Sequence, residues 1–172
     1  MNWKKAAHST SARHQIERLK ESLEELYIRS DPKNVGDPEI ASDLGNYLCV
    51  RVSGYIEQAS GVIFRDYCHK NAGGAVQHFA VSWLDRMPNM SADPLIKLVS
   101  RFSKELASEL EEFLGEEERR GRLNALVGVR NDVAHGRQQG LSRERAWSYF
   151  ELAEEVIEWL LNKFDSMNAP TK

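Results

Sequence analysis

Arg130 and His135 are the two residues whose types and spacing best suit chemistry on a phosphate group. An arginine guanidinium binds phosphate oxygens through two parallel hydrogen bonds, and a histidine imidazole exchanges a proton near neutral pH. Arg130 lies seven, four and three residues after apolar residues with helical spacing, namely Leu123, Leu126 and Val127. A guanidinium on such an apolar stripe is costly unless an anion or dense hydrogen bonding compensates it. The spacing therefore predicts either a structural partner or a bound anion for Arg130.

The surrounding residues 126–136, LVGVRNDVAHG, resemble the Arg-x(4–6)-His motif of the HEPN superfamily, and most of all the group named after its RiboL-PSP members. Four residues separate Arg130 from His135, the polar Asn131 follows the arginine, and Gly136 follows the histidine at a predicted helix end. The motif closes the penultimate of several long predicted helices, and the resemblance covers roughly residues 10–166. It implies an all-α protein and, as in many members, a metal-independent endoribonuclease of toxin–antitoxin or antiphage systems.

The resemblance assigns a role to each residue of the motif. His135 would accept the proton of a ribose 2′-hydroxyl, or orient it, for attack on the adjacent phosphodiester. This attack expels the 5′-oxygen and leaves a 2′,3′-cyclic phosphate. Arg130 would hold the phosphate and stabilise its growing charge, and Asn131 would support the site. No cofactor is expected, and no metal either, because the sequence offers no clustered set of carboxylates and histidines.

Helix geometry sets a condition on this chemistry. Five residues advance an ideal helix by about 500°, so Arg130 and His135 point about 140° apart with about 7.5 Å of rise between them. They converge only if the last turn loosens or if a second copy of the motif faces the first. The resemblance implies a homodimer with the motif at its interface. Gly128 and Ala134 would allow close approach there, although ordinary packing explains both equally well.

The charge of the chain is unevenly distributed, although the formal net charge is only −3. Residues 119–145 hold seven arginines and two acids, whereas residues 104–118 hold seven acids and one lysine. A basic segment around the motif suits a polyanion such as RNA. Arg137, two residues after His135, is predicted to bind substrate. Four further arginines are individually explained at least as well as solvated helix surface: Arg119, Arg120, Arg143 and Arg145.

Glu57 is a candidate that the residues indicate without the resemblance. It lies seven residues from both Val50 and Phe64, on a helix face that is otherwise apolar or small. A carboxylate in such a place requires a cation, and Arg130 is the residue that we nominate. The predicted pair would support the site, but it would equally serve structure alone.

The pattern of apolar residues, caps and breakers predicts helices and no strands. We expect helices over about residues 11–29 and 38–71, a third after Gly73-Gly74 that ends before Pro88, and a fourth from Asp93-Pro94 to about Gly115. The motif helix would run from about residue 116 to Gly136, and the last helix would follow Ser142. The fold class predicted is an all-α, up-and-down antiparallel bundle of four main helices with additional shorter helices. It would form a single HEPN-like domain over residues 1–172, with an ordered core of about 10–166.

Composition restricts the class of protein further. The 172 residues are 41% hydrophobic and 28% charged, which is typical of a soluble globular chain. No segment approaches the apolar run of a membrane span, and residues 1–8 lack the core of a signal peptide, so a cytoplasmic protein without membrane contact is expected. Cys49 and Cys68 lie in one predicted helix without metal-ligand spacing, and we expect reduced, buried thiols.

Three hypotheses for function remain open. The first is an HEPN-type endoribonuclease that acts on cellular RNA as a toxin or antiphage-defence effector, with a cognate antitoxin or another defence protein as a further partner. The alternative is a non-catalytic HEPN module that dimerises and binds RNA, a nucleotide or a protein partner. The third is a helical bundle with an incidental Arg-x(4)-His pattern, which leaves the arginine on the apolar stripe unexplained.

Overall fold

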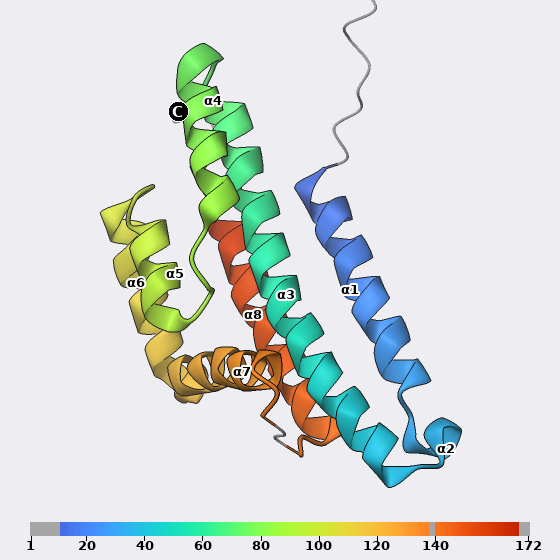
Figure 1. Cartoon of the computed structure of the whole chain (residues 1–172). Coiled ribbons are helices and arrows are strands. Elements are labelled where there is room, and N and C mark those ends of the chain that lie inside the picture. Colours follow the sequence, from blue (N-terminus) through green and yellow to red (C-terminus); the bar gives the residue numbers. More distant parts are fainter. Residues whose placement is uncertain (1–10, 138–139, 169–172) are drawn as a thin grey trace, which may run out of the picture.

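The fold is all-α, as predicted (Figure 1). The computed structural model describes residues 11–137 and 140–168, and these residues contain no strand. The helices are α1 (Ala12–Arg29), α2 (Pro32–Val35), α3 (Pro38–Asn71), α4 (Gly74–Trp83), α5 (Ala92–Val99), α6 (Lys104–Gly115), α7 (Arg119–Ala134) and α8 (Arg143–Met167), with short 3-10 helices η1 (Leu84–Arg86) and η2 (Glu116–Glu118).

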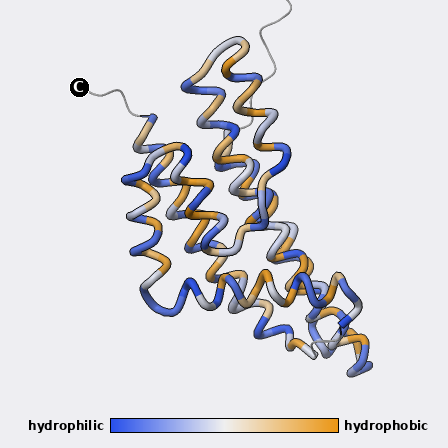
Figure 2. The backbone as a smooth tube through the Cα atoms, turned by 60° about the vertical axis from the view of Figure 1, so that its left-hand side comes forward, coloured by the Kyte–Doolittle hydropathy of each residue, from blue (hydrophilic) through white to orange (hydrophobic). Residues whose placement is uncertain are grey.

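The two longest helices, α3 and α8, form the centre of the bundle. α3 packs along α8 and also contacts α1 and α7. Apolar and polar residues alternate along the helices at short intervals (Figure 2), so that each helix can bury one face. The buried apolar side chains join into one core. In its aromatic part, the rings of Phe64 on α3 and Phe164 on α8 lie 5.2 Å apart between centroids.

The starts of α3 and α8 follow the predicted capping residues. The Asp37 carboxylate accepts a hydrogen bond from the backbone N–H of Glu39 at 2.8 Å, and Pro38 occupies the first turn. The Ser142 hydroxyl accepts from the backbone N–H of Arg145 at 3.2 Å. Both side chains satisfy N–H groups that have no partner within their helix, which fixes where these helices begin.

The prediction of one helix from Asp93 to Gly115 is wrong, because the chain forms the two helices α5 and α6. α5 ends at Val99, and the Ser103 hydroxyl caps α6 by accepting from the backbone N–H of Leu106 at 3.1 Å. Phe102 between the two helices still reaches the core, with its ring stacked 5.2 Å from that of Phe64. The apolar spacing therefore continues through the break, and spacing alone did not reveal it.

The motif helix α7 begins after a sharp change in chain direction. Glu117 and Glu118 adopt left-handed backbone conformations, with φ of 50° and 59°. After this turn α7 lies across the long axes of α3 and α8 near one end of the bundle (Figure 1). Its last turns therefore lie beside the middle of α3, where they can contribute to a site with residues of that helix.

The two cysteines are buried free thiols, in agreement with the prediction. Burial raises the pKa of Cys49 to about 11, since a thiolate in the apolar core would lose its hydration. None of the helices in residues 11–137 and 140–168 combines the length and the apolar character that a membrane span needs.

Candidate functional site

The carboxyl end of α7 is closed by a Schellman motif. The backbone N–H of Gly136 donates to the carbonyl of Val133 at 3.0 Å, and that of Arg137 donates to the carbonyl of Asp132 at 2.9 Å. Gly136 has φ of +73°, which is the left-handed conformation that this motif requires and that glycine adopts without strain. The predicted helix end at Gly136 is therefore confirmed, and His135 is the C-cap residue.

Arg130 lies half-buried in a polar pocket between α7, α3 and the segment after η1. The pocket has a volume of about 390 Å³, and its lining includes Glu57, Gln58, Arg65 and Asn89 besides Arg130. The guanidinium donates one hydrogen bond to the side-chain oxygen of Asn131, at 3.2 Å. Within the described part of the chain, no carboxylate oxygen lies within 4.0 Å of it. The guanidinium of Arg130 is thus held by one amide oxygen, and its other N–H groups can bind an anion.

Glu57 lines the same pocket as Arg130, so the structure brings these two candidates together. It does not pair them, because no ion pair joins them within 4.0 Å among the described residues. The other charged residues of the pocket do pair, with Arg65 Nη2 lying 3.3 Å from the Asp85 carboxylate. Glu57 therefore faces the pocket as a half-buried carboxylate, and its supporting role remains a prediction.

His135 is exposed and lies outside the pocket that Arg130 lines. Its backbone N–H donates to the carbonyls of Asn131 and Asp132, at 3.0 and 3.1 Å, but its imidazole has no hydrogen bond to any described residue. The ring is available to solvent or to another molecule. One chain does not place Arg130 and His135 in one pocket, in agreement with the angle expected for an α-helix.

Asn131, Asp132 and Arg137 form a short polar network around the helix end. Asn131 accepts a hydrogen bond from Arg130, so the polar residue after the arginine helps to hold the guanidinium. Asp132 binds the exposed side chain of Arg137 at 3.1 Å, so this acid moderates the local positive charge. An incoming anion would have to share Arg137 with Asp132.

The arginine-rich segment divides into an internal part and an outer part. Arg119 is bound by Glu116, Glu117 and Glu155, and its side chain is only 11% exposed. Arg120 is bound by Asp93 and Glu111. These arginines neutralise the acidic stretch that precedes them, so the positive charge left for a ligand lies toward the carboxyl end of α7.

Residues 58–90 contribute pocket walls that sequence reasoning missed. Gln58, Arg65 and Asn89 line the pocket, and none of them was among the predicted site residues. Gly61 is the signal that was available. A Cβ atom there would lie 2.9 Å from the Met87 side chain and 2.7 Å from Arg65, so glycine lets the segment after η1 approach α3.

The described residues contain no group of three or more histidine, cysteine, aspartate or glutamate side chains placed to hold a metal ion. Besides the ion pair of Arg65 and Asp85, the polar groups of the pocket are the guanidinium of Arg130, one carboxylate and two side-chain amides. These groups can bind the phosphate, hydroxyl and base edges of a nucleotide.

This arrangement defines the class of protein as an all-α bundle in which residues 130–136 close a transverse helix. The model of the RiboL-PSP-HEPN family matches residues 14–165. Because this match covers most of the 172 residues, the chain belongs to the RiboL-PSP-HEPN family. No curated protein and no solved structure matches it.

Proposed function

We propose that the protein is a metal-independent endoribonuclease that acts on cellular RNA as a toxin or antiphage-defence effector. The observation that carries the proposal is the state of the motif, with a half-buried Arg130 that no described carboxylate neutralises and an exposed His135 at the end of the same helix. A guanidinium neutralised by an internal anion, or a buried imidazole, would have argued against catalysis. Family membership supports the HEPN module, many of whose members cleave RNA.

The proposed site is composite. Arg130 of one subunit holds the scissile phosphate, and His135 of a second subunit accepts the 2′-hydroxyl proton. Asn131 keeps the guanidinium oriented through the 3.2 Å hydrogen bond. Arg137 adds positive charge at the rim, and Glu57 orients Arg130 when the phosphate draws it across the pocket. The 5′-oxygen leaves, and the RNA keeps a 2′,3′-cyclic phosphate.

The chemistry is tested with purified protein and total RNA in EDTA. Fragments should carry a terminal phosphate that phosphatase removes only after acid has opened the cyclic ester. His135→Ala should lower the cleavage rate by about 10²–10⁴-fold, as expected for loss of a general base. His69→Ala, which removes an exposed histidine of α3, is the matched control and should leave the rate unchanged. Cleavage that survives His135→Ala, or that requires a divalent metal, contradicts the mechanism.

The composite site is tested by mixing two inactive variants, Arg130→Ala and His135→Ala. Half of the randomly formed dimers would be hybrids, and each hybrid would hold one site with both residues intact. Activity should therefore recover to about a quarter of the wild-type value. Full inactivity of the mixture, with hybrids present, would show that each subunit must supply both residues.

The second candidate is an HEPN module that binds RNA, a nucleotide or a protein partner without cleaving it. The observation that favours it is that Arg130 and His135 do not share a pocket within one chain. In that case wild-type protein binds RNA, Arg130→Ala weakens binding, and no cyclic phosphate forms.

A further inference from the structure

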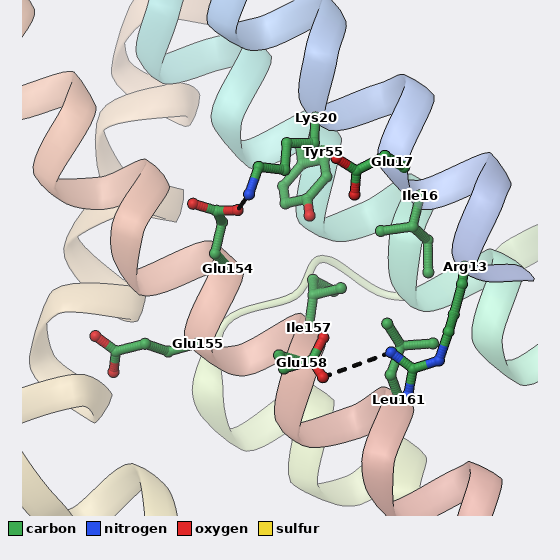
Figure 3. Close-up of a pocket in the computed structure, with 10 residues that line it drawn as sticks. All are labelled: Arg13, Ile16, Glu17, Lys20, Tyr55, Glu154, Glu155, Ile157, Glu158 and Leu161. Carbon is green, nitrogen blue, oxygen red and sulfur yellow. Dashed lines mark ion pairs between the residues drawn. The ribbon is translucent and has the colours of Figure 1, made fainter.

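A groove between α1 and α8, floored by α3, lies apart from the motif (Figure 3). Its volume is about 450 Å³. The side chains of Ile16, Ile157 and Leu161 form apolar walls, and charged side chains of α1 and α8 stand along the rims. None of the motif residues on α7 lines this groove, so any ligand here would be independent of the proposed cleavage site.

The floor of the groove carries a hydroxyl group without a partner. Tyr55 is only 4% exposed, and its hydroxyl points into the groove (Figure 3). The ring is held edge-on to Phe150, with 5.6 Å between centroids. No hydrogen bond joins this hydroxyl to any residue that the structure describes. Because the rest of the Tyr55 side chain is buried, its hydroxyl can be hydrogen-bonded only from the groove, by water or by a ligand that binds there.

The charges around the hydroxyl select a cation. Glu17 stands beside Tyr55 and makes no ion pair within the described residues. Glu158 lies 3.5 Å from Arg13, whose shorter contacts, of 3.0 and 3.2 Å, are with Asp165. Burial raises the pKa of the Tyr55 phenol above its ordinary value, and the nearby glutamates of α8 and α1 raise it further. Four glutamates line the groove against two cations, Arg13 and Lys20, and this excess of negative charge disfavours an anionic ligand.

The spacing of the carboxylates and the apolar walls between them indicate the size and chemical type of cation that fits the groove. Glu154 and Glu158 lie one turn apart on α8, which is about 6 Å along the helix axis. Glu154 is bound to Lys20, and Glu158 lies 3.5 Å from Arg13 although its side chain is 58% exposed. Glu17, on the opposite rim, makes no ion pair among the described residues. A compact metal ion would leave the apolar walls unused. An aliphatic chain with an ammonium group at each end would use both walls and rims.

We propose that this groove binds an aliphatic diamine or polyamine. One ammonium group donates hydrogen bonds to the Glu17 carboxylate and to the Tyr55 hydroxyl, and the methylene chain lies on Ile157 and Leu161. The second ammonium group binds Glu158. Since this site bridges α1 and α8, the bound amine ties the first helix to the centre of the bundle.

The test is calorimetric titration of the full-length protein with 1,4-diaminobutane and with spermidine. One equivalent should bind per chain, and 1-aminobutane, which has the same carbon chain with one charge, should bind more weakly. Glu17→Gln should weaken diamine binding about tenfold, the effect of losing a charge-assisted hydrogen bond. Tyr55→Phe, which keeps the ring and removes only the hydroxyl, should weaken it about fivefold.

Glu21→Gln is the matched control, since Glu21 is exposed one turn further along α1 and does not line the groove. It should bind the diamine as the wild type does. The proposal is overturned if the wild type binds no diamine, if Glu21→Gln weakens binding as much as Glu17→Gln, or if Tyr55→Phe binds as tightly as the wild type. Glu17 is exposed, so its variant keeps the fold and the outcome can be interpreted.

Discussion

Replacing Gly136 with alanine tests whether the left-handed closure of α7 holds the motif in place. No described atom lies within 4 Å of the Cβ that this change would add, so the substitution causes no clash. Its effect is confined to the backbone at φ of +73°. A Cβ in the left-handed region costs about 1–2 kcal/mol, and the lower entropy of the unfolded alanine chain offsets about 0.4–1 kcal/mol of this. The expected net loss of stability is about 1 kcal/mol.

Gly121→Ala is the matched control on the same helix. Its Cβ would also meet no described atom within 4 Å, but Gly121 lies inside α7 without a positive φ. Alanine is better than glycine in a helix interior by about 0.5–1 kcal/mol. The same chemical change should therefore stabilise the protein at one position and destabilise it at the other.

Urea unfolding at a fixed protein concentration, followed by circular dichroism, measures both effects. With a slope of about 2 kcal/mol per molar urea, the two midpoints should differ by about 0.8–1 M. Gly136→Asn should fall between wild type and Gly136→Ala, because asparagine tolerates the left-handed region. If Gly136→Ala is as stable as Gly121→Ala, the helix end is not closed by the Schellman motif, and the position deduced for His135 fails with it.

Three further predictions address packing, association and pH. Gly45→Ala should lower the free energy of unfolding in urea by about 1–3 kcal/mol, because the added Cβ would overlap the backbone oxygen of Leu141. Unchanged stability would contradict the close approach of α3 to the start of α8. Gly128→Ala has open space in the single chain and should keep or raise its stability, but it should weaken self-association in analytical ultracentrifugation if α7 faces a second copy. Raising the pH from about 9 to 11 should remove about 2 kcal/mol of stability, because burial raises the pKa of Cys49 from an ordinary value of 9.0 to about 11. This stability is fully present below pH 9, and Cys49→Ala should reduce its loss; an equal loss in that variant would contradict the assignment.

The helical class and the end of α7 could be predicted because local chemistry determines them. The side chains of Asp37 and Ser142 accept hydrogen bonds from backbone N–H groups in the first turns of α3 and α8, and Gly136 ends α7 through its left-handed backbone conformation. Because each effect depends on the residue type at one position, it can be predicted from the sequence. The break between α5 and α6 was missed because Phe102 packs on the core from outside a helix and keeps the apolar spacing. The spacing of apolar residues indicates which side chains are buried, and a side chain such as that of Phe102 can be buried without belonging to a helix.

The candidate site was predictable only in part for a related reason. Arg130 stood out because its charge conflicts with an apolar stripe, and Glu57 stood out for the same reason on another helix. That both line one pocket follows from α7 crossing α3, and this crossing depends on the left-handed turn at Glu117 and Glu118. Glutamate rarely adopts the left-handed conformation, so the residue types at positions 117 and 118 do not predict this turn.

The closure of α7 also bears on how Arg130 and His135 can act together. Convergence within one chain would require the last turn to unwind, which breaks the backbone hydrogen bonds of His135, Gly136 and Arg137 to the carbonyls of residues 131–133. Each such bond contributes about 1 kcal/mol, so unwinding would cost several times the thermal energy before any substrate is bound. A second subunit can supply the missing residue while both helices stay intact. The rigid end of α7 therefore favours a site shared between two copies, and the recovery of activity from two inactive variants is the measurement that distinguishes this arrangement from a site within one chain.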